Sequence, residues 1–76
     1  SNAVSQDFGL RDQMLRAAVS IASNIAEGYA RETSPDRIHL LTVARGSCAE
    51  LETQLFIAEE AGLMLATDAA MLRESC

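Results

Sequence analysis

The chain of 76 residues has no lysine and no tryptophan, and it has only one tyrosine, two phenylalanines and one proline. The positive charge therefore comes from six arginines, and with eleven acidic residues the net charge is −5. Proteins bind phosphate backbones through clustered lysine and arginine, and this chain has no such cluster. Nucleic acid is accordingly disfavoured as a direct partner.

The shortage of aromatic residues also limits the core. Hydrophobic residues make up 49% of the chain, but many of them are alanines, which bury little area each. Domains of this size bury only about 60% of the surface of the unfolded chain. We therefore expect self-association to supply the burial that a single copy lacks.

Long apolar runs and ligand motifs are absent as well. No run approaches the roughly 20 apolar residues of a membrane span, and no signal-peptide pattern is present, so we expect a soluble, cytoplasmic protein with no membrane partner. The two cysteines, Cys48 and Cys76, have no metal-site spacing, and His39 is the only histidine. Neither a metal nor a cofactor is expected, and Cys48 is interpreted as a small buried hydrophobic residue.

What the chain does contain is helical periodicity without strand alternation. Residues 1–3 resemble the remnant of a cleaved expression tag, which leaves 4–76 as a single helical bundle domain. Pro35, after the capping candidates Thr33 and Ser34, indicates a helix start, and Gly62 indicates a left-handed helix end. The expected fold is all-α, an antiparallel bundle made of a long helical hairpin and a short third helix, as in an incomplete four-helix bundle. The expected helices cover residues 9–30, 35–61 and about 67 to the C-terminus.

The first expected helix has an apolar arc that fills about half of its circumference, wider than the roughly 100° stripe of a helix with one neighbour. We therefore expect it to contact two or more helices. The second expected helix combines one strong apolar seam with weaker apolar flanks, and this pattern favours contacts from other chains.

A short loop makes these two helices antiparallel. Counting outward from the turn places Gly46 level with Ser20 and Glu50 level with Arg16. Glycine costs a helix about 1 kcal/mol relative to alanine, so we predict close backbone approach at Gly46. The same count predicts that the charged ends of Arg16 and Glu50 approach each other across the hairpin.

The polar side of the first helix has two interpretations, which the sequence leaves open. It is either a solvated surface, supported by the i,i+4 pairs Asp12–Arg16 and Glu27–Arg31, or a polar network at an interface. The candidate interface or network residues on the two long helices are Arg16, Ser20, Asn24, Glu27, Arg45 and Glu50.

Two separated segments carry a family resemblance. The stretch 16–28, followed by Ala44-Arg45-Gly46-Ser47 and by residues 50–55, resembles the bacterial four helix bundle protein family, first noticed in intervening sequences of 23S ribosomal RNA. The resemblance covers about residues 8–65. It implies a helical bundle that assembles as a ring-like homo-oligomer, typically a pentamer, and it supplies no enzymatic activity. Members usually carry a further N-terminal helix, and they commonly have proline where Ala22 stands, so a truncated or divergent member is expected.

Together these features predict a non-enzymatic, self-associating scaffold or interaction module whose protein partner the sequence does not name. The alternative is an accessory protein that binds RNA or a reverse transcriptase, because distant relatives serve retroelements; the negative net charge argues against it. An enzyme ranks third and would need a closed pocket in which Glu27, His39 and Arg45 converge.

Overall fold

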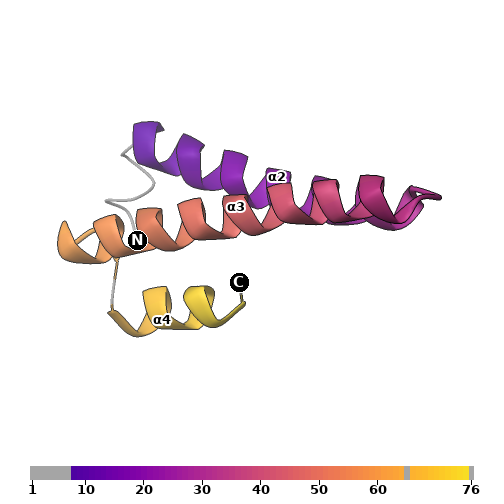
Figure 1. Cartoon of the computed structure of the whole chain (residues 1–76). Helices are drawn as coiled ribbons and strands as arrows, with labels where there is room; N and C mark the ends of the chain where they lie inside the picture. Colours follow the sequence, from indigo (N-terminus) through magenta and orange to yellow (C-terminus); the bar gives the residue numbers. More distant parts are fainter. Residues whose placement is uncertain (1–7, 65, 76) are drawn as a thin grey trace.

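The computed structural model describes residues 8–64 and 66–75, which form three helices (Figure 1). They are α2 (Phe8–Ala30), α3 (Ser34–Glu60) and α4 (Ala66–Ser75). Helix α3 is central, because α2 and α4 both pack against it. This arrangement confirms the all-α hairpin with a short third helix. A fourth helix is not seen in the described part of the chain.

The turn between α2 and α3 is held by an arginine. Thr33 occupies the N-cap of α3 with extended backbone angles (φ −100, ψ 145), as its position predicts, but its side chain makes no capping hydrogen bond. That part of the prediction is wrong. Arg37, in the first turn of α3, instead donates from Nε to the carbonyl of Gly28 at 3.2 Å and from Nη2 to the carbonyl of Arg31 at 2.8 Å. The carbonyl of Gly28 also accepts from the backbone N–H of Arg31 at 3.3 Å, so Arg37 adds a second donor there and supplies one to the carbonyl of Arg31, past the end of α2.

The end of α3 follows the prediction. Gly62 has φ +72, a left-handed conformation that favours glycine. The N–H of Gly62 donates to the carbonyl of Glu59 at 3.0 Å, and the N–H of Leu63 donates to that of Ala58 at 2.8 Å. This pair of bonds is a Schellman motif, and it turns the chain back toward α4.

Close approach of the two long helices occurs at a different glycine from the predicted one. A Cβ placed on Gly46 would meet nothing within 4 Å, so the predicted close approach there is wrong. A Cβ on Gly28 would lie 3.3 Å from Cδ2 of Leu41 and 3.6 Å from the carbonyl oxygen of Arg37. Gly28 is buried close to the turn that connects α2 to α3, and the short connection explains why the two helices pack more tightly there.

The core is small and built mainly of alanine. Leu55 is the one large side chain that is fully buried among the described residues; the other buried hydrophobic residues are Ala17, Ala44, Ala58 and Ala69. Helix α4 is held to α3 by burial of Ala69 and by an ion pair between Arg73 and Glu59 at 3.0 Å. Alanines allow close helix packing, but they bury little area, so the core leaves larger side chains outside it.

Some expectations fall on other parts of the chain. The tag remnant at residues 1–3 and the C-terminal Cys76 lie outside the described residues. Cys48 lies on α3 and is half-buried rather than fully buried. Within the described residues, no helix is both long enough and apolar enough to cross a membrane.

Candidate functional site

A polar network joins α2 to α3 inside the hairpin. The hydroxyls of Ser20 and Ser47 lie 2.7 Å apart, and the Ser47 residue is only 7% exposed. Nδ2 of Asn24 donates to the carbonyl of Ser20 at 2.8 Å and to its hydroxyl at 3.1 Å. Two of the six candidate residues, Ser20 and Asn24, therefore belong to one network between helices. The network lies within a single chain.

Ser47 was not among the sequence candidates. The count from the turn placed Gly46 opposite Ser20, one residue short of the observed partner. Gln54 lies seven residues further along α3, on the same side as Ser47 at helical spacing. Its Oε1 is buried without a hydrogen-bond partner among the described residues. The polar edge of the α2–α3 contact thus contains one paired hydroxyl couple and one unpaired acceptor.

Two other candidates, Arg16 and Glu27, are exposed on α2 and pair with neighbours on their own helix. Nε of Arg16 lies 2.9 Å from Oδ2 of Asp12, and Nη2 of Arg31 lies 4.0 Å from Oε2 of Glu27, which confirms both predicted i,i+4 pairs. Exposed pairs of this kind contribute only about 0.3–0.5 kcal/mol each. They leave the charges accessible to another molecule.

The last two candidates, Arg45 and Glu50, are exposed on α3. No ion pair links Arg16 to Glu50 among the described side chains, and Arg16 pairs with Asp12 instead. Their predicted approach across the hairpin stays a prediction. The six candidates thus divide into two that join helices within the chain and four that face outward.

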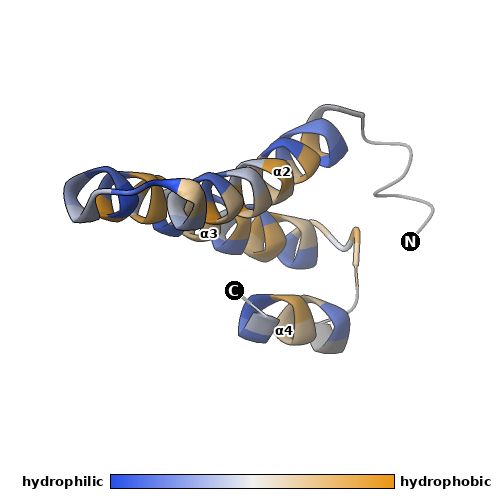
Figure 2. Ribbon diagram, turned by 90° about the vertical axis from the view of Figure 1, so that its right-hand side faces the viewer, coloured by the Kyte–Doolittle hydropathy of each residue, from blue (hydrophilic) through white to orange (hydrophobic). Residues whose placement is uncertain are grey.

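The main concave surface is an apolar groove of about 740 Å³ between the three helices, which no single sequence motif signalled. Figure 2 shows hydrophobic segments, in orange, on all three helices. The broad apolar arc of α2 was the sequence feature that indicated such a surface, because one neighbour cannot cover it. The groove is lined by Arg11, Met14, Leu15, Ala18, Ile21, Ala22, Ile25, Cys48, Leu51, Leu55, Leu72 and Ser75.

Large apolar side chains are exposed on the rest of the surface as well as at the groove. Among the described residues, ten are more than a third exposed, on all three helices, and three of these (Leu15, Ile25 and Leu72) also line the groove. The ten are Leu15, Val19, Ile25, Tyr29, Ile38, Val43, Phe56, Ile57, Met71 and Leu72. Singly exposed apolar residues are ordinary, but contiguous ones mark interaction surfaces.

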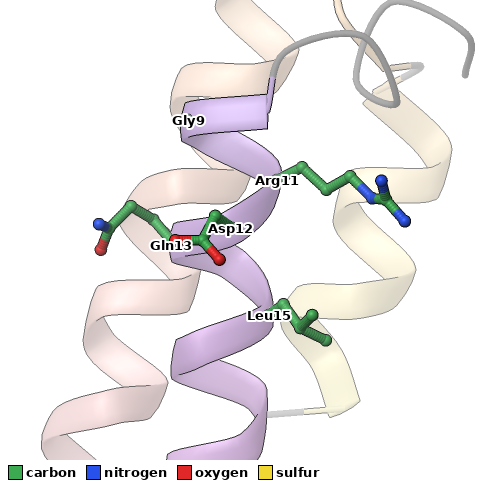
Figure 3. A pocket seen from close by; sticks show the side chains of 5 residues that line it. All are labelled: Gly9, Arg11, Asp12, Gln13 and Leu15. Atoms are coloured by element: carbon green, nitrogen blue, oxygen red, sulfur yellow. The ribbon is translucent and has the colours of Figure 1, made fainter.

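Two shallow depressions offer little to a small ligand. The one at the start of α2 is lined by residues of that helix alone, Gly9 to Leu15, so it has no opposite wall (Figure 3). Figure 3 shows Arg11 and Leu15 projecting to one side of α2 and Gln13 to the other. His39 lies exposed beside Arg31 and Asp36 in the second depression, near the turn. Glu27, His39 and Arg45 are joined by no hydrogen bond or ion pair in the described part of the chain. No group of three potential metal ligands occurs there either.

The fold and its surfaces define a class, that of small all-α bundle proteins whose apolar surface extends beyond their own core. The sequence profile described as 23S rRNA-intervening sequence protein matches residues 2–76. The chain belongs to this family, as its two motifs indicated. No match was found among curated proteins or among solved structures.

Proposed function

We propose that this protein is a non-enzymatic, self-associating helical scaffold or interaction module. One observation carries the proposal: ten large apolar side chains are exposed, whereas Leu55 alone is fully buried among the described large ones. Fully burying a large apolar side chain contributes about 1.5–3 kcal/mol, and these ten are 39–72% exposed, so covering several of them in an assembly adds stabilisation to that of the internal core. The family resemblance sets the expected number of copies at five, arranged as a ring.

The charge distribution supports a protein partner over a nucleic acid. Three of the six arginines pair with carboxylates of their own chain, namely Arg16, Arg31 and Arg73. Arg37 binds two backbone carbonyls at the turn. Phosphate binding needs clustered cations, and each of these four arginines lies beside a carboxylate or a carbonyl in a chain of net charge −5, so this distribution favours association through apolar faces.

Sedimentation equilibrium over a concentration series tests the proposal. We expect a mass of several chains at about 100 µM, and dissociation on dilution accompanied by a lower unfolding midpoint, because association stabilises the folded state by mass action. Far-ultraviolet circular dichroism at each concentration reports whether the chain stays folded. A single-chain mass throughout the series, with an unchanged helical spectrum and unfolding midpoint, would overturn the proposal.

A further inference from the structure

The exposed side of α2 has a regular pattern along its length. Seven residues, here called the α2 stripe, follow helical spacings of three and four and share one face about 120° wide. All seven are exposed, the four large ones by 40–72%. The α2 stripe comprises Leu15, Ala18, Val19, Ala22, Ile25, Ala26 and Tyr29.

The α2 stripe is symmetric about Ala22. Three positions before and after it stand the β-branched residues Val19 and Ile25, and four positions away on each side stands an alanine. Seven positions away stand the large side chains Leu15 and Tyr29. When two copies of such a helix pack antiparallel with a two-fold axis at the centre, positions equidistant from the centre lie at the same level along the helices. Large side chains of the α2 stripe then share a level with large ones and alanines with alanines, and the alanine at the centre allows the helix axes to approach to about 8 Å.

The charges beside the α2 stripe fit the same arrangement. Arg16 lies six residues before Ala22, and Glu27 lies five residues after it, on the same edge of the helix. Antiparallel pairing brings Arg16 of one copy to within one residue, about 1.5 Å, of the level of Glu27 of the other, on the same edge and twice by symmetry. Parallel pairing in register would place the two copies of Arg16 at one level and the two copies of Glu27 at another, on opposite edges, so no arginine would lie level with a glutamate. The ion pairs that these residues make within the chain are exposed, so Arg16 and Glu27 can also contact a second copy.

We propose that α2 binds α2 of a second copy of this chain, antiparallel, about a two-fold axis at Ala22. This inference rests on the self-association proposed above and specifies the surface and its symmetry. A two-fold contact by itself joins two copies, and two five-membered rings joined by such contacts contain ten copies in all. Four residues of the α2 stripe also line the apolar groove, so a partner helix covers the edge of that groove.

Disulfide trapping in the full chain, with Cys48 and Cys76 replaced by alanine, tests the symmetry. Ala22→Cys is expected to cross-link to itself on mild oxidation, because the two copies of that position meet at the axis. The control is Ala26→Cys, whose two copies lie about 12 Å apart along the helices, beyond the roughly 7 Å limit for a disulfide. We expect at least about five-fold less covalent dimer from Ala26→Cys alone, and recovery when it is mixed with Ala18→Cys. Equal self-cross-linking of both variants, or none at position 22, would overturn the proposal.

A charge substitution separates this surface from the other exposed apolar faces. Ala22→Glu places two carboxylates at the axis and is expected to remove the two-fold contact, halving the mass or more in sedimentation equilibrium. Ala49→Glu makes the same change at an exposed alanine of α3 and is expected to leave the α2 cross-link unchanged. Loss of association from Ala49→Glu together with full association of Ala22→Glu contradicts the α2 contact, although self-association itself survives. A wild-type chain of single-chain mass contradicts both proposals.

Discussion

The hydrogen bond between Ser20 and Ser47 predicts a measurable coupling between the two long helices. Ser47 is only 7% exposed, and its hydroxyl lies 2.7 Å from that of Ser20. Replacing Ser20 by alanine leaves the buried Ser47 hydroxyl without this partner, which costs about 1–3 kcal/mol. Replacing both serines removes the polar groups together, and a change of this kind is close to neutral. We therefore expect the double variant to be less destabilised than the sum of the single variants, by about 1 kcal/mol.

Urea unfolding followed by circular dichroism, at one fixed protein concentration, measures this coupling as a double-mutant cycle. The higher helix propensity of alanine contributes equally with and without the partner serine, so it cancels in the cycle. Ser23→Ala combined with Ser47→Ala is the matched control, because Ser23 is exposed on the same helix and should be additive. If the Ser20 and Ser47 effects also add within about 0.3 kcal/mol, the network does not join the helices and the reasoning fails.

Three further predictions concern Gly46, Gly62 and nucleic acid. Gly46→Ala should raise the free energy of unfolding by about 1 kcal/mol, because a Cβ there meets nothing within 4 Å. A lower free energy of unfolding for this variant, measured by urea unfolding, would reveal a contact at that position. Gly62→Ala should lower the free energy of unfolding by about 1–2 kcal/mol, because Gly62 has a φ of +72 that alanine adopts only at a cost. An unchanged midpoint of urea unfolding would argue against the left-handed cap. At about 0.15 M salt, we expect the protein to cause no mobility shift of structured RNA. A shift whose binding constant falls linearly with salt concentration on a double-logarithmic plot would favour the RNA-binding alternative.

The helices and their ends could be predicted because their signals are local. Pro35 in the first turn and Gly62 after the last turn limit α3 within the sequence itself, and the i,i+4 ion pairs of α2 depend on helical spacing alone. The bounds of α2 (Phe8–Ala30) and the start of α4 at Ala66 also lie within about one residue of the expected positions.

The register between the helices could not be predicted to one residue. Counting from the turn placed Gly46 opposite Ser20, whereas Ser47 is the observed partner. One residue along a helix is a shift of only about 1.5 Å, but it is also a rotation of about 100°, which changes the residue that faces the neighbour. Arg37 binds the end of α2 and shapes the turn, and no count of loop residues includes such a contact.

The sequence by itself determined that this chain is helical, where its long helices begin and end, and that it has more apolar circumference than a hairpin can bury. These properties follow from backbone preferences and from spacings along one helix. Only the tertiary structure decided which part of the α2 arc faces α3 and which part is left open, because rotation about a helix axis is fixed by side-chain packing between helices. It also decided that the close approach lies at Gly28, where Leu41 packs against the helix backbone.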